Sequence, residues 1–381
     1  MTVFYMKSIP SSIILHLSLI DRIGPSVIER ILTQLDPDNV ANIYRFSVSD
    51  FCTLFSISPA TAQKIVDGLA DNQILERELF LIERHKISWA TIFDDTYPEL
   101  LKNIHLPPAV IYWRGALTNS DQTLAIVGSR DANRYGQQTI TQIVPMLVDK
   151  GWIIVSGGAR GADTMAHKAT LHAGGKTIAV LGSGLLKLYP PENKDLFEQI
   201  VQSGGVLLSP FPLLMDPLPI NFPARNRVIA GLSKGTIVVQ AAIKSGARIT
   251  ADYCLSQGRE VFAIPGPIDE PLSAGCNALI QQGAKLTTGV ADILIEFGQV
   301  MEQSLPTKGH LKTSDQPVIQ QTFIEETCVE GVIVRTCQKP CSVDELLGAT
   351  GLPLIQMTKL LFDLQLKGLL AQNMAGLWEK Q

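Results

Sequence analysis

The strongest constraint on this chain is a regular alternation of short apolar runs with segments of helical periodicity between residues 123 and 297. The runs are rich in Val, Ile and Leu, so both faces of the corresponding strands are expected to be buried. Helices that connect such strands by right-handed crossovers produce a doubly wound sheet. The sequence therefore predicts an α/β fold with a Rossmann-like, mostly parallel sheet, whose strands lie in TLAIVG, WIIVSG, TIAVLG, GVLLS, TIVVQA and EVFAIPG.

The sequence before this alternation is helical in character. Residues 1–85 contain apolar-periodic stretches separated by a turn at Ile23-Gly24-Pro25 and by a helix start at Ser58-Pro59. Such short turns between helices are typical of a helix-hairpin or SAM-like domain. We expect residues 1–85 to form this domain and residues 86–300 to form the Rossmann-like domain.

The sequence after the alternation first loses its periodicity and then recovers it. Residues 301–320 are rich in Pro, Gly, Ser and Thr, which predicts a linker. Residues 321–381 contain a capping box at Ser342–Glu345, an amphipathic helix and a hairpin turning near Ala375-Gly376. This order predicts a winged helix. Its second helix has few cations, which favours contact with a protein, or weak DNA binding, over sequence-specific reading of a duplex.

A glycine-rich segment follows the second predicted strand directly and precedes a helix. It reads Ser156-Gly157-Gly158-Ala159-Arg160-Gly161. Glycines at such a turn let a phosphate approach the backbone, and the helix start supplies N–H donors. The spacing departs from the dinucleotide fingerprint GxGxxG, and no acidic residue follows about 20 positions later. The segment therefore predicts phosphate binding without a nicotinamide or flavin cofactor. Asp163 either orients Arg160 or compensates the helix dipole.

Polar and cationic residues also gather in the other loops at the carboxyl ends of the predicted strands. Because these ends meet at one edge of the sheet, we expect the loops to converge there. The predicted phosphate-binding residues are Gly128, Ser129, Arg130, Ser156, Gly157, Gly158, Arg160, Gly161, Arg225, Asn226, Arg227, Lys244, Ser245 and Arg248. They would form a local basic strip on a chain whose net charge is −4.

Catalytic chemistry has little support in these loops. Hydrolysis of a nucleotide requires an acid–base pair or a metal cage, and the candidate carboxylates are Asp131, Asp163 and Glu260. His167 lies on the helix after the glycine segment, where a packed role is the commoner one. Cysteines 328, 337 and 341 lack CxxC spacing, so no metal site is expected. The sequence favours binding over catalysis, with no cofactor.

Seven of these segments together resemble the DNA processing protein A family, also called DprA or Smf. They are GSR, SGGARGAD, TIAVLGSG with Tyr189-Pro190, FPARNRVIAGLS, KSGARITA, QGREVFAIPG and GCNALIQQGA. The resemblance covers about residues 90–297. Two positions depart from the family pattern: Pro210 stands where an acid is common, and Gln240 stands where Glu is frequent. Both departures make the predicted site less acidic.

The resemblance implies a protein that binds single-stranded DNA, protects incoming DNA and helps to load the RecA recombinase during natural transformation. It also implies a homodimer formed through the Rossmann-like domain. Arg130, the loop carrying Arg160, and the Arg225–Arg227 segment would then face DNA phosphates, without reading sequence. Single-strand binders add aromatic stacking; the candidates are Tyr135, Tyr189 and Phe222, although we expect Phe222 to lie in the core.

Two alternatives remain open. The first is a nucleotide-processing hydrolase similar to the lysine-decarboxylase-like phosphoribohydrolases, but their Pro-Gly-Gly-x-Gly-Thr loop has no counterpart here. The second is an interaction scaffold with a vestigial site, which would have no affinity for DNA. The sequence shows neither a signal peptide nor an apolar run long enough to span a membrane, and its six cysteines suit a reducing compartment. We therefore expect a cytoplasmic protein.

Overall fold

The computed structural model describes residues 9–35, 37–299, 329–366, 369–373 and 377–380. The chain divides into two compact units, Met1–Gln303 and Ser304–Gln381. The predicted linker and the predicted hairpin turn at Ala375-Gly376 lie outside the described residues. Among the described helices, none is both long and apolar enough to cross a membrane.

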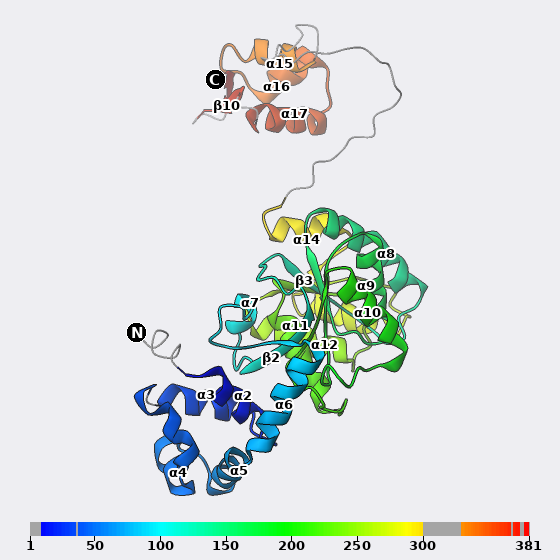
Figure 1. The fold of residues 1–381 in the computed structure, drawn as a ribbon. Helices are drawn as coiled ribbons and strands as arrows, with labels where there is room; N and C mark the ends of the chain where they lie inside the picture. Colours follow the sequence, from blue (N-terminus) through cyan, green and yellow to red (C-terminus); the bar gives the residue numbers. More distant parts are fainter. Residues whose placement is uncertain (1–8, 36, 300–328, 367–368, 374–376, 381) are drawn as a thin grey trace, which may run out of the picture. The chain divides into compact units, whose positions relative to one another are not determined.

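The larger unit is built around a sheet that contains nine strands in the described residues (Figure 1). Their order is β1-β2-β6-β5-β4-β3-β7-β8-β9, and the neighbours from β6 to β9 are parallel. The strands are β1 (Ser88–Thr91), β2 (Val110–Gly115), β3 (Thr123–Val127), β4 (Ile153–Ser156), β5 (Thr177–Val180), β6 (Val206–Ser209), β7 (Gly235–Val238), β8 (Glu260–Ala263) and β9 (Lys285–Leu286). The six predicted strands are β3 to β8, which confirms the Rossmann-like sheet. Strands β1 and β2, which run antiparallel at one edge, and β9 were not predicted.

The strand order reverses once within the parallel part of this sheet. From β3 the chain adds β4, β5 and β6 on one side, and then returns to place β7 on the other side of β3. The loops after β3 and β7 therefore diverge at this point. In open α/β sheets such a switch point leaves a crevice outside the carboxyl ends of the strands.

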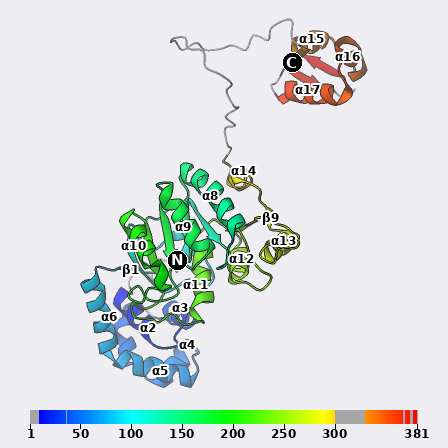
Figure 2. The same cartoon turned by 90° about the vertical axis from the view of Figure 1, so that its right-hand side faces the viewer.

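Helices cover both faces of the sheet (Figures 1 and 2). Side chains alternate between the two faces: Leu124 and Ile126 of β3 pack with α8 and α9, whereas Ala125 and Val127 pack with α11 and α12. This double burial explains why the strands read as continuous apolar runs. The helices of this region are α7 (Glu99–Lys102), α8 (Arg134–Asp149), α9 (Ala162–His172), η2 (Pro191–Asn193), α10 (Lys194–Gln202), α11 (Asn221–Gly231), α12 (Gly246–Ser256), α13 (Ala274–Gln281) and α14 (Val290–Glu296).

The helices near the N-terminus pack against the edge of this sheet. They are α2 (Ser11–Leu19), α3 (Pro25–Gln34), η1 (Pro37–Arg45), α4 (Val48–Phe55), α5 (Pro59–Ala70) and α6 (Asn72–His85). Ser58 caps α5 by accepting a hydrogen bond from the Thr61 N–H, as its position before Pro59 predicted. One hydrophobic core joins these helices to β2 and α10, so the predicted boundary near residue 85 crosses a shared core. The Glu78 carboxylate of α6 accepts a hydrogen bond of 2.8 Å from the Leu213 N–H, in the loop before α11.

The smaller unit contains three helices and a two-stranded antiparallel sheet within its described residues. They are α15 (Val329–Thr336), α16 (Val343–Thr350), α17 (Leu354–Leu366), β10 (Leu370–Gln372) and β11 (Trp378–Lys380). The predicted capping box is present: Ser342 and Glu345 cap one another's backbone N–H groups at the start of α16. A core of its own, which includes Met357, Leu361 and Trp378, holds these elements together.

Candidate functional site

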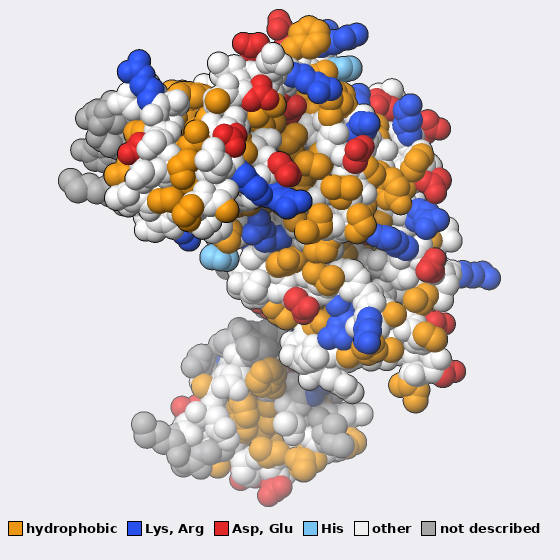
Figure 3. Space-filling view, turned by 90° about the horizontal axis from the view of Figure 1, so that it is seen from below, with side chains coloured by type: hydrophobic (Ala, Val, Ile, Leu, Met, Phe, Trp, Pro, Cys, Tyr) orange, Lys and Arg blue, Asp and Glu red, His pale blue; other side chains and the backbone are white. Residues whose placement is uncertain are grey.

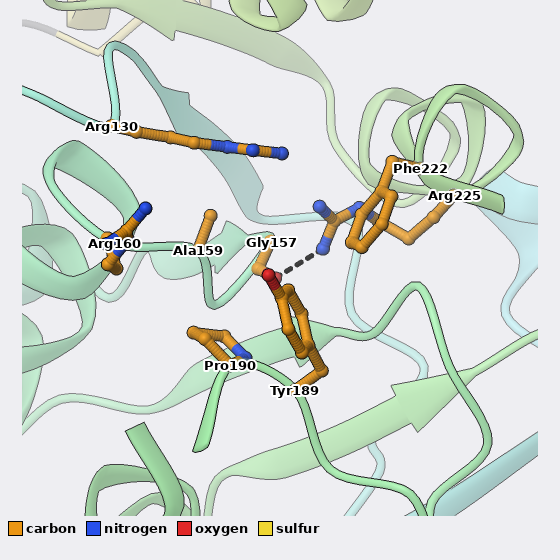
Figure 4. A pocket seen from close by; sticks show the side chains of 8 residues that line it. All are labelled: Arg130, Gly157, Ala159, Arg160, Tyr189, Pro190, Phe222 and Arg225. Atoms are coloured by element: carbon orange, nitrogen blue, oxygen red, sulfur yellow. Dashed lines mark hydrogen bonds between the residues drawn. The ribbon is translucent and has the colours of Figure 1, made fainter. Parts of the chain in front are cut away.

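A small pocket lies at the carboxyl edge of the sheet, where several strand-end loops meet (Figure 4). In the view of Figure 4 the Arg130 side chain lies above, Phe222 and Arg225 lie on the right, and the Tyr189 ring lies below. We call it the aromatic pocket; its lining residues are Arg130, Gly157, Ala159, Arg160, Tyr189, Pro190, Phe222 and Arg225. They come from the loops after β3, β4 and β5 and from α11. The structure thus brings together three of the four segments that the sequence predicted to converge, those of Arg130, Arg160 and Arg225. The loop of Tyr189 and Pro190 joins them in the pocket, and Lys244 of the fourth segment lines a neighbouring groove.

Two of the loops interlock through their backbones. The Ala162 N–H, at the start of α9, donates a 3.0 Å hydrogen bond to the carbonyl of Ser129, in the loop after β3. Gly161 has φ of +73°, and a Cβ there would lie 2.3 Å from the same Ser129 oxygen. Only glycine suits this position, because the conformation is left-handed and the space is already filled.

We expect Gly161→Ala to destabilise the protein and to displace the glycine loop. The left-handed backbone alone costs about 1–3 kcal/mol for a residue with a Cβ, and the clash with Ser129 adds to that cost. Urea unfolding followed by circular dichroism measures the loss. Gly174→Ala is the matched control, because Gly174 also has positive φ (+71°) but no atom within 4 Å of the place that a Cβ would take. Equal losses in the two variants would contradict the close approach at Gly161.

The Arg225 side chain is the buried centre of the pocket. It is 5% exposed, and its guanidinium donates hydrogen bonds to the carbonyls of Gly157 and Val180, at the ends of β4 and β5. Burial lowers the pKa of Arg225 to about 10, so the group stays protonated at neutral pH. The carboxylate of Asp163 lies beside it and accepts a 3.2 Å hydrogen bond from the Ala159 N–H. Burial raises the pKa of Asp163, and the charge of Arg225 opposes that rise.

The exposed cations of the pocket are Arg130 and Arg160, as the sequence predicted. The Arg130 guanidinium lies over the Phe222 ring, 5.7 Å from its centroid, and Arg225 lies 5.8 Å from the same centroid. The Tyr189 ring is 5.9 Å from Phe222 and is 41% exposed. Phe222 is only partly buried, so its predicted place in the core was wrong: it forms a wall of the pocket. Tyr135 instead donates a hydrogen bond to the carbonyl of Pro265, outside the pocket.

Six of the remaining predicted residues lie next to the aromatic pocket, in a neighbouring groove or in the glycine loop. Asn226, Lys244 and Ser245 line a neighbouring, larger groove together with Gly128 and Ser129. Gly158 lies in the glycine loop, where its carbonyl accepts a hydrogen bond from the Asn193 side chain.

The other three do not present their side chains to this surface. The buried Ser156 hydroxyl donates to the carbonyl of Ile126, because Ser156 is still part of β4. Arg227 is half-buried near Tyr97 and Tyr253, since it points away from Arg225 on the helix. Arg248 donates to the carbonyl of Ile243 and to Gln282.

Two supporting residues were not predicted as part of the site. The Asn193 amide donates to the Gly158 carbonyl at 2.8 Å and to the Thr164 hydroxyl at 2.7 Å, which holds the glycine loop. Gln240 accepts a hydrogen bond from the Asn133 N–H and donates one to the Asn133 side chain, both at 3.0 Å. An amide performs both roles, whereas a carboxylate at this position would only accept.

The candidate acid–base groups are poorly placed for catalysis at the pocket. The imidazole of His167 is fully buried and hydrogen-bonded to Thr177, and burial lowers its pKa to about 3. Glu260 begins β8, at the opposite edge of the sheet from the pocket. Asp163 is buried beside Arg225, and Asp131 is exposed on the groove. In the part of the chain that the structure describes, no cluster of three metal-ligating side chains is found.

The pocket gathers cations although the chain as a whole is weakly acidic. Figure 3 shows one face of the molecule, on which basic, acidic and hydrophobic side chains are interspersed. The aromatic pocket contains three arginines within eight lining residues. A local concentration of cations is therefore compatible with a net charge of −4.

Comparison with known proteins gives consistent results for sequence and for structure. The family model of DNA recombination-mediator protein A matches residues 88–298. The DNA processing protein DprA of Bacillus subtilis is 38% identical over 276 residues, which are 70% of this chain and 93% of that protein. DprA of Streptococcus pneumoniae is 43% identical over 216 residues, covering 56% of this chain and 76% of that protein.

Two solved structures of such proteins resemble the fold. The crystal structure of DprA from Streptococcus pneumoniae has a TM-score of 0.59 at 34% identity, covering 77% of this chain and 96% of that one. A structure of DprA from Helicobacter pylori, described for its single-stranded DNA binding mode, has a TM-score of 0.50 at 28% identity, with coverages of 55% and 95%. The chain therefore belongs to the DNA recombination-mediator protein A family, which includes the proteins named DprA and Smf.

Proposed function

We propose that this chain is a DNA-processing protein that binds single-stranded DNA at the aromatic pocket. The observation that carries the proposal is that two exposed arginines, Arg130 and Arg160, line one small pocket with the rings of Tyr189 and Phe222, next to a loop of glycines. Exposed guanidinium groups attract phosphates without reading sequence. Aromatic rings stack on bases that are not paired, which favours single strands over a duplex. The Helicobacter pylori relative, whose structure is described for single-stranded DNA binding, supports the same assignment.

The resemblance to the family supports further parts of the proposal. We infer that the protein protects incoming DNA, helps to load RecA during natural transformation, acts in the cytoplasm and forms a homodimer through its Rossmann-like domain. The three helices and two strands of the smaller unit have the element order of a winged helix. We propose that this winged helix contacts a protein partner rather than reading duplex DNA, because Lys359 on α17 is accompanied by Asp363.

The alternative of a nucleotide-processing hydrolase has weaker support. Such a reaction needs a carboxylate or histidine that reaches the substrate and exchanges a proton with it. His167 is buried and neutral. The buried Asp163 carboxylate accepts a hydrogen bond from the Ala159 N–H and lies beside the positive charge of Arg225. The exposed groups of the aromatic pocket are cations and aromatic rings, which bind rather than cleave.

Fluorescence anisotropy tests the proposal directly. The protein is titrated into a labelled thymidine oligonucleotide and into a matched duplex over a series of salt concentrations, with a nucleotide-hydrolysis assay in parallel. We expect salt-sensitive binding that prefers the single strand, without release of base or phosphate. If the oligonucleotide does not bind at low salt and a mononucleotide is cleaved, the proposal fails and the pocket is instead the active site of a hydrolase.

A further inference from the structure

The smaller unit contains two buried thiols in direct contact. Cys337 follows α15 directly, and Cys341 lies four residues later, in the turn before α16. Their Sγ atoms are 3.3 Å apart. Among the cysteines that the structure describes, this is the one pair whose sulfurs meet. The buried thiols of Cys254 and Cys276 instead face the backbone carbonyls of Glu260 and Val238.

The backbone attaches both cysteines of the pair to the same strand, β11. Cys341 exchanges two hydrogen bonds with Trp378, of 3.0 Å from its N–H and 2.8 Å to its carbonyl. The Cys337 carbonyl accepts a 2.8 Å hydrogen bond from the Lys380 N–H, and the Cys337 N–H donates to the carbonyl of Ile333 at 3.0 Å. A bond between the two sulfurs would therefore close the short turn between them and tie the end of α15 to β11.

The contact between the sulfurs is too short for two ligands of one zinc ion. Two thiolates at about 2.3 Å from a tetrahedral zinc lie about 3.8 Å from each other. A disulfide has its sulfurs about 2.05 Å apart, which the pair reaches by a short approach of the two side chains. In the described part of the chain, no third metal-binding side chain joins them. The pair is better arranged to bond to itself than to a metal.

The two thiols differ in their access to a reagent in solution. Cys341 is 6% exposed, whereas Cys337 is fully buried. Burial raises the pKa of the Cys337 thiol, and the Cys341 sulfur beside it raises that pKa further, so Cys337 stays protonated at neutral pH. Because thiolate character and exposure govern the oxidation of cysteine, a small oxidant reacts first with Cys341.

We propose that Cys337 and Cys341 form a site of reversible oxidation by hydroperoxides, with an intramolecular disulfide as the product. In the first step, the Cys341 sulfur takes an oxygen atom from the hydroperoxide and becomes a sulfenic acid, while the hydroperoxide is reduced to an alcohol, or to water from hydrogen peroxide. In the second step, the Cys337 sulfur attacks the Cys341 sulfur. The S–S bond forms, the S–O bond breaks, and the hydroxyl group leaves as water with the Cys337 proton.

The two thiols supply both electrons of this oxidation, so no further reductant is needed. A small dithiol returns the pair to its reduced form by exchange through a mixed disulfide. In a reducing compartment such a disulfide is transient, as expected of a modification rather than a permanent structural bridge. The proposal is independent of the proposed function, because the pair lies in the smaller unit and the aromatic pocket lies in the larger one.

Peptide mapping of the full chain after treatment with hydrogen peroxide tests the site. Trypsin does not cleave Lys339-Pro340, so one peptide, 336–359, carries both cysteines, whereas Cys328 lies on the peptide that ends at Arg335. We expect peptide 336–359 to lose two hydrogen atoms in mass and to regain them with dithiothreitol. A disulfide to Cys328 would instead join two peptides. The sulfoxide of Met146, which is 38% exposed, shows in the same digest that the oxidant was sufficient.

The variant Cys337→Ala tests the order of the two steps. Without the attacking thiol, the sulfenic acid at Cys341 should persist, and dimedone should capture severalfold more of it than in the wild type. The matched control is Cys276→Ala, which removes a fully buried thiol outside the pair and should leave the disulfide unchanged. Circular dichroism shows whether each variant has kept its fold.

Hydrogen exchange measures the effect of the disulfide on β11. The N–H groups of Trp378 and Lys380 donate to the carbonyls of the two cysteines. Closing the turn restricts local opening of this strand, so both should exchange severalfold more slowly in the oxidised wild type and at an unchanged rate in peroxide-treated Cys337→Ala.

Three results would overturn the proposal. The first is an unchanged mass of peptide 336–359 in a sample in which Met146 is oxidised. The second is a disulfide that contains Cys328 in place of Cys341 or Cys337. The third is equal capture by dimedone in the wild type and in Cys337→Ala, because the Cys337 thiol would then take no part in the second step.

Discussion

Replacing Arg225 by glutamine is expected to lower the free energy of unfolding by about 3–5 kcal/mol, the usual cost of removing one member of a buried charged pair. The loss arises because the carbonyls of Gly157 and Val180 lose their charged donor, and because Asp163 remains buried without compensation. Urea unfolding of the full chain, followed by circular dichroism, measures the change. Binding of single-stranded DNA should fall as well, since Arg225 holds the glycine loop and supports the Phe222 ring.

Two further variants separate this explanation from a general sensitivity of α11. Arg227→Gln changes the same residue type on the same helix but outside the pocket, and it should cost about 1 kcal/mol or less. Asp163→Asn in the Arg225→Gln background should restore part of the lost stability, because it removes the uncompensated carboxylate. If the double variant is no more stable than Arg225→Gln alone, the coupling between the two charges is absent.

Reversing both exposed arginines of the pocket, Arg130→Glu with Arg160→Glu, should weaken binding of single-stranded DNA on the order of 100-fold at moderate salt. The slope of log affinity against log salt should become shallower by about 1.4, because two phosphate contacts are lost from a single strand. Folding stability should change little, since both side chains are exposed. Anisotropy titrations across a salt series give both quantities.

The control for this double reversal is Lys150→Glu with Lys176→Glu. It changes the net charge by the same amount, but both lysines precede strands and lie at the opposite edge of the sheet from the pocket. Its effect on affinity should be small and its salt slope nearly that of the wild type. A similar loss in both double variants would mean that total charge governs binding, and the aromatic pocket would lose its assigned role.

The strands of the parallel sheet could be predicted because burial on both faces selects mainly apolar residues, as in Thr177–Val180. The antiparallel edge was harder to predict. Strand β1 reads Ser-Trp-Ala-Thr and is buried only in its second half, so it is not a continuous apolar run, and β2 follows a segment with two prolines. Strand β9 has two residues, too few for any periodicity. Short strands are defined by the neighbour with which they pair, and that neighbour is distant in sequence.

Within the site, residue type and loop position were enough to predict the exposed Arg130 and Arg160. The same reasoning could not separate them from Arg225, because an arginine that bonds buried carbonyls and one that faces solvent have the same local sequence. The place of Phe222 was likewise decided by its contacts, since Tyr189 and two guanidinium groups surround a ring that the sequence alone assigned to the core. Asn193 acts on a loop 35 residues away in the chain, and no local pattern indicates that contact.

The hydrogen bond between Glu78 and the Leu213 N–H affects how genetic data on this protein should be interpreted. It anchors the loop that leads into α11, and α11 carries Phe222 and Arg225. A substitution in α6 can therefore shift the pocket without touching any ligand. Suppressor or loss-of-binding mutations that map to residues 72–85 would not, by themselves, identify a second contact surface for DNA.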